Sequence, residues 1–216
     1  MAEFDLLCCV VNMGDASKVL KFARKYGIKE GTISIGKGTA HSRILEFLRI
    51  NEIRKEIVTM IADRKLASAA LRGINEDMAF EKPHHGIAFS YPITQLEPDG
   101  NPGDTDKIIS EERAPMDSYS AIYVIVDKGK AEEVIAAANH AGARGGTIVN
   151  ARGSGIHEAQ KFFSIEIEPE KEKVFIIARD EKKDDIIASV RTALKIDEPG
   201  NGVIYVLPIN EVYGLH

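Results

Sequence analysis

The sequence contains no tryptophan, only two cysteines and few aromatic residues, which make up 6% of its 216 residues. The cysteines, Cys8 and Cys9, are neighbours. Neighbouring residues on a strand point to opposite faces, so these two are badly placed to form a disulfide with each other or to share a metal ion. We expect two buried free thiols in a reducing compartment.

Long apolar runs and an excess of basic residues are also missing. No stretch approaches the ~20 uninterrupted apolar residues of a membrane-spanning helix, and the first ten residues, MAEFDLLCCV, lack the basic start of a secretory signal. The net charge is −5, whereas proteins that bind nucleic acid usually carry a basic face. The sequence therefore predicts a cytoplasmic protein that is not embedded in a membrane and has no nucleic acid as its main partner.

An internal repeat occupies most of the chain. A shift of 115 residues places Gly14, Gly27, Gly31 and Gly38 on Gly129, Gly142, Gly146 and Gly153. One extra residue then enters the second copy, and a shift of 116 places Pro83, Gly86 and Pro92 on Pro199, Gly202 and Pro208. We interpret this as a duplication and predict a first module at residues 1–97, an acidic proline-containing linker at 98–118 and a second module at 119–216.

Each copy predicts the element order β-α-β-β-α-β. Two right-handed crossovers in that order give a four-stranded antiparallel sheet with both helices on one face, the ferredoxin-like arrangement. The predicted fold is therefore α+β, with two such modules in tandem. The strands are expected at residues 6–11, 31–35, 56–62 and 86–92 and at 122–126, 146–149, 173–178 and 202–208, and the helices at 16–26, 64–75, 131–141 and 182–194.

Three features recur in order in both copies: a glycine-bearing loop after the second strand, a Pro-x-x-Gly turn, and a closing strand that ends in Pro-Ile. The second copy carries them in GTIVNARGSG and DEPGNGVIYVLPINEVYGL. With these features both modules, about residues 4–96 and 119–215, resemble the P-II (nitrogen-regulatory) signalling family.

The resemblance implies a small trimeric regulator without catalytic turnover. Members of the family bind ATP or ADP between subunits, often sense 2-oxoglutarate, and dock a flexible loop onto enzymes or transporters. For this chain the resemblance implies a homotrimer with six modules and a small anionic effector such as ATP, ADP or AMP, bound at clefts between modules. It implies no required cofactor, and it implies a target that is an enzyme or a membrane transporter, with nitrogen metabolism as one setting.

Candidate ligand-binding residues follow from the positions of these motifs. Glycine-rich turns can present backbone N–H groups to an anion, and a neighbouring Lys or Arg adds charge; alternatively, the glycines only permit positive φ in tight turns. No catalytic or metal-binding residue is assigned. The candidates are Thr32, Lys37, Gly38, Thr39, Lys82 and Gly86 in the first copy and Thr147, Arg152, Gly153, Ser154, Gly200 and Gly202 in the second.

The sequence also departs from the family pattern. Neither loop has the modifiable tyrosine, residues 212–216 lack the terminal arginine pair, and the position of the phosphate-binding turn lysine holds Ile87 and Val203. These departures favour the alternative of a structural or adaptor protein that has lost its ligand site, whereas the glycine turns retained in both copies favour a sensor. A metal-handling relative on the scaffold of the copper-tolerance family is a more distant variant of the alternative. Within the chain, Lys82 against Glu198 predicts that the first copy is the more favourable for anions.

Two further groups have ordinary interpretations. His84 and His85 lack the spaced third ligand of a metal site and are expected to be solvated. Glu56 and Glu172 each follow a lysine, and a surface ion pair would account for them. No nucleophile motif is present, so we do not expect an enzyme.

Overall fold

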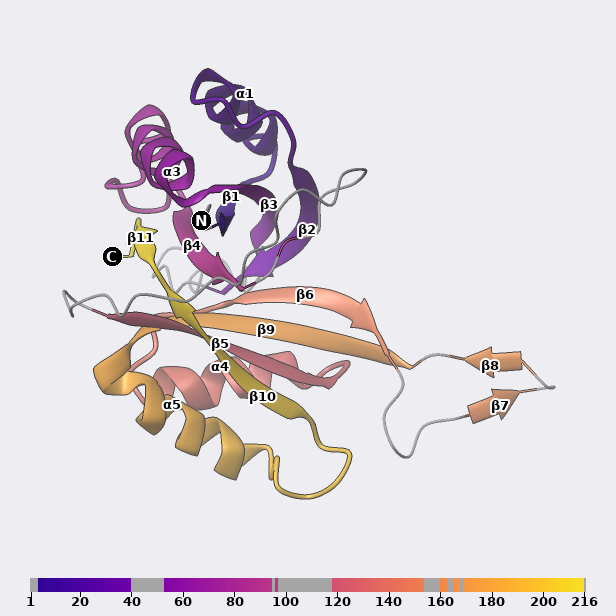
Figure 1. Cartoon of the computed structure of the whole chain (residues 1–216). Coiled ribbons are helices and arrows are strands. Elements are labelled where there is room, and N and C mark those ends of the chain that lie inside the picture. Colours follow the sequence, from indigo (N-terminus) through magenta and orange to yellow (C-terminus); the bar gives the residue numbers. More distant parts are fainter. Residues whose placement is uncertain are drawn as a thin grey trace. The chain divides into compact units, whose positions relative to one another are not determined.

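The computed structural model describes residues 4–39, 53–94, 96, 118–153, 160–162, 165–167 and 169–215. Helices and antiparallel strands are mixed along the chain (Figure 1), which confirms the predicted α+β class. The predicted linker lies outside the described residues except for Ser118.

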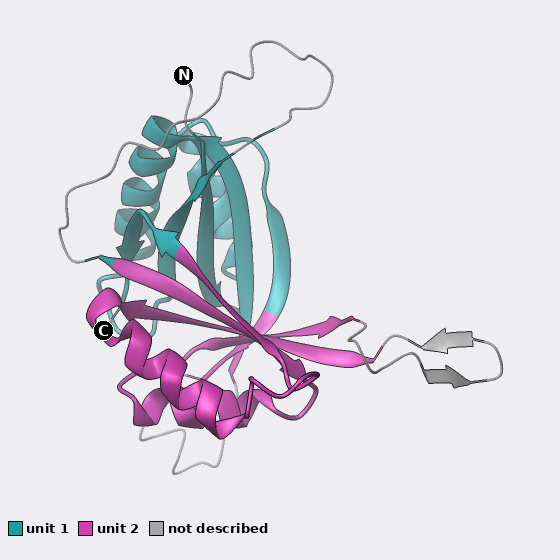
Figure 2. Cartoon of the chain, turned by 60° about the horizontal axis from the view of Figure 1, so that its bottom comes forward, with its two compact units in different colours: residues 1–35, 55–118, 208–216 teal, residues 36–54, 119–207 magenta. Residues whose placement is uncertain are grey.

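The chain divides into two compact units (Figure 2). Unit 1 comprises Met1–Ile35, Lys55–Ser118 and Pro208–His216, and unit 2 comprises Gly36–Arg54 and Tyr119–Leu207. Two segments are therefore assigned to the unit that does not hold the rest of their repeat. The predicted module boundaries remain a prediction, and each compact unit combines most of one repeat with a segment of the other.

Unit 1 contains the elements of the first copy in the predicted order. Its strand order is β2-β3-β1-β4-β11, in which β11 comes from the end of the second copy. Helix α1 ends just before Gly27, which has a φ of +96°, a conformation that glycine adopts at little cost. The elements are β1 (Phe4–Asn12), α1 (Ala16–Lys25), β2 (Thr32–Gly38), β3 (Ile53–Asp63), α3 (Arg64–Met78), β4 (Ile87–Ile93) and β11 (Glu211–Tyr213).

Unit 2 repeats the arrangement with the second copy. Its strand order is β10-β5-β9-β6, and the last residues of β2, which belong to this unit, pair with β6. A short hairpin, β7–β8, precedes β9. The elements are β5 (Tyr119–Asp127), α4 (Ala131–His140), β6 (Thr147–Arg152), β7 (Gln160–Phe162), β8 (Ile165–Ile167), β9 (Glu170–Arg179), α5 (Asp180–Ala193) and β10 (Val203–Ile209).

Each unit has a core between its helices and its sheet, built from the periodicities of the sequence. Alternate residues of β1 point into the unit 1 core, where they meet the apolar faces of α1 and α3. Alternate residues of β5 do the same against α4 and α5 in unit 2. Equivalent buried residues of the two cores include Leu7, Cys9 and Val11 with Ile122, Val124 and Val126, and Val19 with Val134.

The cysteines are buried and free, as predicted. Cys9 is fully buried in the unit 1 core. Burial, together with the neighbouring Cys8, raises the pKa of the Cys9 thiol far above its ordinary value. A thiol in this environment stays protonated and is not a nucleophile.

Candidate functional site

The base of the first predicted loop lies beside the start of β6, in unit 2. Lys37 pairs with Ile148, and Gly38 with Thr147, in the ladder between β2 and β6. The Thr39 hydroxyl accepts from the amide of Gly146 at 3.0 Å and donates to its carbonyl at 3.1 Å. Both Thr39 and Thr147 are buried. The hydroxyl of Thr39 is therefore used to join the two strands.

The base of the second predicted loop, which begins at Arg152, lies at the other end of β6. Arg152 is the last residue of β6, opposite Glu170, and the Gly153 amide donates to the carbonyl of Pro169 at 3.1 Å. Arg152 lies five positions after Thr147 along the extended strand, about 17 Å at ~3.3 Å per residue. Ser154 lies outside the described residues. The predicted loop residues of the second copy thus do not converge on one point.

The threonine and glycine-turn positions within each copy are also apart. Thr32 is on β2, while Gly86 precedes β4, and two strands of the unit 1 sheet lie between β2 and β4. Thr147 and Gly202 have the same relation across β9 and β5 in unit 2. At ~4.8 Å per strand, each separation is about 14 Å. A site composed of both features is not formed inside either unit.

The glycine turn before the last strand is built identically in both copies. Gly86 has a φ of +131° and Gly202 a φ of +146°. A Cβ atom would lie 2.5 Å from the Val10 carbonyl at Gly86 and 2.6 Å from the Ile125 carbonyl at Gly202. Only glycine allows this close approach, so these two glycines have a structural requirement whether or not a ligand binds.

The repeated acid of the third strand stabilises a helix start. One carboxylate oxygen of Glu56 accepts from the amides of Gly14 and Ala16 at 3.0 and 2.9 Å. Glu172 makes the same two bonds, to Gly129 and Ala131, at the same distances. The prediction of a surface ion pair did not include these two bonds. The carboxylate satisfies free amides at the positive end of a helix, and it occupies the place an anion would otherwise take.

A lysine lies beside the glycine turn in unit 1. The Lys55 amine, half-buried on β3, donates to the side-chain oxygen of Asn12 at 2.6 Å. The Asn12 amide group in turn donates to the carbonyl of His84 at 3.2 Å. Burial lowers the pKa of Lys55, an effect that the charge of Asp15 partly offsets. We call Asn12, Lys55 and the turn of residues 82–86 the first turn site.

The equivalent place in unit 2 has a different charge pattern. Lys171 forms an ion pair with Asp127, which stands where the first copy has Asn12. Lys128 pairs with Glu170, and its hydrogen bond and charge, aided by Arg152, lower the pKa of that carboxyl. We call Asp127, Lys171 and the turn of residues 198–202 the second turn site. Its lysine is already neutralised by a carboxylate.

Nine equivalent positions around the two turn sites sum to opposite charges. The first copy has three basic residues and two acids, a sum of +1, while the second has three basic residues and four acids, a sum of −1, with histidine counted as neutral. The charge around the first turn site is therefore positive and that around the second is negative, and positive charge attracts anions. The positions are Asn12, Met13, Asp15, Arg54, Lys55, Glu56, Lys82, His84 and His85, against Asp127, Lys128, Lys130, Glu170, Lys171, Glu172, Glu198, Gly200 and Asn201.

Asn12 and Lys55 were not among the residues predicted from the motifs. Lys55 recurs as Lys171 in the second copy, and a residue present in both copies suggests a common structural role, not a ligand contact in one of them. The signal was in its partner: Asn12 replaces Asp127 at the paired position. Two strands must be aligned before those residues are known to be neighbours, and the ladder between β1 and β3 provides that alignment.

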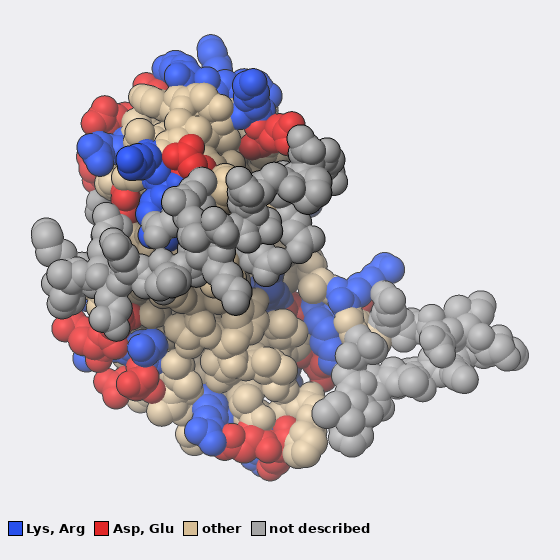
Figure 3. All heavy atoms as spheres, in the orientation of Figure 1, with Lys and Arg blue, Asp and Glu red and all other residues tan. Residues whose placement is uncertain are grey.

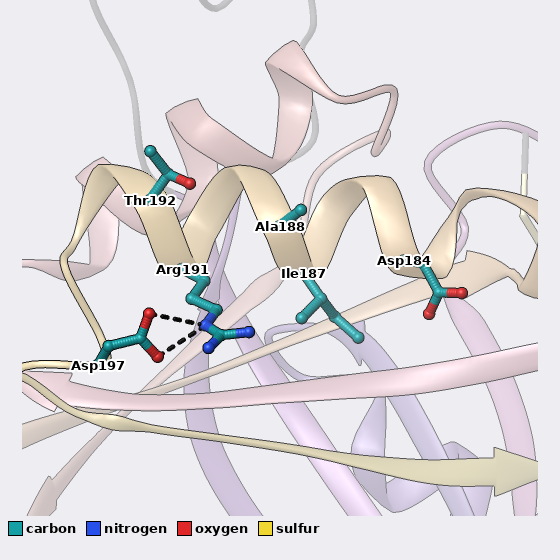
Figure 4. Close-up of a pocket in the computed structure, with 6 residues that line it drawn as sticks. All are labelled: Asp184, Ile187, Ala188, Arg191, Thr192 and Asp197. Atoms are coloured by element: carbon teal, nitrogen blue, oxygen red, sulfur yellow. Dashed lines mark hydrogen bonds and ion pairs between the residues drawn. The ribbon is translucent and has the colours of Figure 1, made fainter.

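None of the predicted site residues lines the pocket beside α5. This shallow pocket lies along the helix, and the Arg191 guanidinium there donates two hydrogen bonds to the carboxylate of Asp197, at 2.7 and 2.9 Å (Figure 4). His84 and His85 are exposed, and the described residues contain no cluster of three metal-ligating side chains. No helix among the described residues is long and apolar enough to cross a membrane.

The strand order and the helix positions are compatible with the ferredoxin-like arrangement. The family model of Nitrogen regulatory protein P-II matches residues 119–216. The second half of the chain thus matches the P-II family, which confirms the predicted relationship for this copy, and the match does not extend into residues 1–118. P-II proteins are regulatory, generally bind effectors and target proteins, and form trimers. No curated protein matches the chain.

Proposed function

We propose that this chain is a non-enzymatic, P-II-like regulatory protein that senses a small anionic ligand and regulates a target enzyme or transporter. An adenine nucleotide is the ligand class that the family relationship favours, and nitrogen metabolism is one setting. The proposed protein is a cytoplasmic homotrimer. The charge difference between the two turn sites is the observation that supports ligand binding, since it separates one copy from the other on the same backbone.

The first turn site is where we place the anion. Lys55 supplies a positive charge that has an amide oxygen, not a carboxylate, as its hydrogen-bond partner. Partial burial strengthens its interaction with an arriving phosphate or carboxylate group, because the effective dielectric is lower than in water. Lys82 adds a second charge on the turn itself. In this proposal Gly86 shapes the turn, and Lys55 replaces the missing turn lysine as the anion contact.

The second copy has the sequence match to the family but the less favourable charge. Its lysine is paired with Asp127, and Arg152 faces Glu170. This neutralisation favours the alternative function, a scaffold or adaptor with the ligand site lost, for that copy. We therefore propose a division of labour in which the first copy binds the ligand and the second maintains the assembly or contacts the target.

A matched pair of exchanges tests the proposal. Calorimetry and thermal unfolding would be measured with ATP, ADP, AMP and 2-oxoglutarate on the full chain, on Asn12→Asp and on Asp127→Asn. A ligand at 100 times its Kd raises the free energy of unfolding by about 2.7 kcal/mol. We expect Asn12→Asp, which places a carboxylate beside Lys55, to weaken binding by about tenfold, or ~1.4 kcal/mol.

The reverse exchange is the control for general effects of charge. Asp127→Asn is expected to leave the first-copy affinity unchanged. Absence of binding with all four compounds would overturn the sensor proposal and leave the scaffold function. Equal weakening by both exchanges would show that the ligand does not distinguish the two sites.

A further inference from the structure

Helices α1 and α4 are equivalent in the repeat but carry opposite charge. Helix α1 contains four basic residues and no acid, whereas α4 contains two acids and no Lys or Arg. Because α4 forms the same helix without basic residues, the fold itself does not require the charges of α1. The four positions, related by the shift of 115, are Lys18, Lys21, Arg24 and Lys25, against Glu133, Ala136, Asn139 and His140.

The four charges form the outer surface of α1. All exposed residues of this helix are basic except Ser17, because its apolar residues turn toward the unit 1 core. The side chains of Lys18 and Lys25 are 65% and 52% exposed. Figure 3 shows Lys and Arg side chains gathered at the top of the view, where Figure 1 has α1. We call Lys18, Lys21, Arg24 and Lys25 the α1 basic face.

Only half of this charge is paired within the protein. The Lys18 amine lies 2.7 Å from a carboxylate oxygen of Asp15, and the Lys25 amine lies 3.1 Å from one of Asp77. Exposed pairs of this kind hold their partners weakly. The other two side chains of the face have no such partner in the described part of the chain. The α1 basic face is therefore available to an anionic partner outside the chain.

The composition of the face distinguishes a lipid surface from a protein surface. Protein interfaces are enriched in aromatic residues, Met and Arg and depleted in Lys. Three of the four charges here are lysines, and no apolar residue of α1 is exposed to act as an anchor. The lysine amine is a compact, strongly hydrated point charge, which suits a partner whose negative charge is spread over a surface.

The start of α1 is unsuited to nucleic acid. A helix that reads the major groove contacts the bases with its N-terminal residues. At this end of α1 lie two carboxylates, that of Asp15 and that of Glu56, which accepts from the Ala16 amide at 2.9 Å. These carboxylates repel phosphate groups at the end of the helix that would have to enter the groove.

We propose that the α1 basic face is a contact surface for anionic lipid headgroups, through which the protein associates with the surface of a membrane. Each Lys or Arg near an anionic bilayer strengthens binding about fivefold. The ten residues of α1, about 15 Å in length, present their charges on a convex surface that a flat bilayer reaches without a groove. Because no apolar residue accompanies the charges, the contact is reversible and sensitive to salt.

This inference goes beyond the proposed sensor function and does not depend on its ligand. It adds a surface that brings the protein to a membrane, where a transporter target would lie. The first turn site and the α1 basic face therefore fail or succeed in separate experiments.

The experiment measures co-sedimentation of the full chain with vesicles of phosphatidylglycerol and phosphatidylcholine, and with vesicles of phosphatidylcholine alone. The protein carries a net charge of −5, so binding to the anionic vesicles requires a local basic surface. We expect the wild type to bind only the anionic vesicles at ~0.05 M salt and to be released at ~0.5 M, where screening is stronger. The double variant Lys21→Ala with Arg24→Asn, which introduces the residues of α4, should bind at least about tenfold more weakly.

Lys182→Ala with Lys195→Ala is the matched control. It removes two exposed charges from unit 2, and the position equivalent to Lys195 already holds Ala79. This variant should bind the vesicles like the wild type. If the α1 double variant folds poorly, Lys18→Glu, which introduces the residue type of the second copy, should weaken binding to a similar degree.

Three results would overturn the proposal: no binding of the wild type to anionic vesicles, equal binding to both kinds of vesicle, or equal weakening by the two double variants. A mixed-sequence oligonucleotide is the competing anion. If it bound the wild type while the anionic vesicles did not, the α1 basic face would be a nucleic-acid surface and the lipid proposal would be wrong.

Discussion

The two turn sites share a backbone and differ in charge. Both have a glycine at positive φ against the end of the first strand, and both have a glutamate that bonds to the start of the first helix. Around this common frame, the substitution of Asn12 for Asp127 changes the partner of the neighbouring lysine from a carboxylate to an amide. The comparison shows which residues the fold needs twice and which are free to diverge.

The largest effect should come from the shared frame. Gly86→Ala and Gly202→Ala each place a Cβ against a carbonyl oxygen, at 2.5 and 2.6 Å, in a backbone conformation that alanine rarely adopts. We expect each to lower the free energy of unfolding by about 2–3 kcal/mol. Urea unfolding of the two variants would measure the losses.

Gly153→Ala is the control for replacing a glycine. Its nearest neighbour to a new Cβ is a Lys171 side-chain atom at 3.9 Å, an ordinary contact. A change within about 0.5 kcal/mol is expected. If Gly86→Ala were tolerated and Gly202→Ala were not, the two turns would not be equivalent, and the comparison of the copies would fail.

The glycines, apolar periods and repeat were sufficient to predict the helices and most strands, because local conformation and burial determine them. Strand β11 was missed, since three residues after a proline-containing strand carry no periodic signal and their pairing with β4 is long-range. The bonds of Glu56 to the helix start were also missed. Its sequence neighbour is Lys55, but its bonding partners are about forty positions earlier in the chain.

The first and second turn sites were only partly predictable for a similar reason. The motifs identified Gly86 and Gly202, whose requirement is local. Lys55 and Asn12 become a site only when β1 and β3 are paired in register. Glycine signatures therefore located the turns, while the charge that distinguishes them comes from strands that lie next to each other only in the folded protein.

A smaller effect should follow removal of the shared acid. Glu56→Ala and Glu172→Ala leave two amides at a helix start without their carboxylate partner. We expect each to cost about 1–2 kcal/mol in the free energy of unfolding. Glu→Gln at the same positions keeps an acceptor and loses the charge, so it should cost less. Equal losses in the two copies support a structural role, whereas a loss of ligand binding with unchanged stability would contradict it.

The smallest expected effect concerns the titration of Lys55. Burial lowers the pKa of Lys55, so the folded state binds fewer protons than the unfolded state between the lowered pKa and the ordinary value near 10.4. Stability from this group therefore rises as the pH increases through that interval. Asn12→Asp raises the pKa of Lys55 and should abolish the rise. Because the side chain is partly exposed and solvent screens its charge, the difference should be only about a few tenths of a kcal/mol. Urea unfolding of the wild type and the variant at about pH 8 and pH 10.5 would measure it. Parallel pH profiles for the two proteins would mean that Lys55 does not feel the residue at position 12, and the charge distinction between the copies would then lose its physical basis.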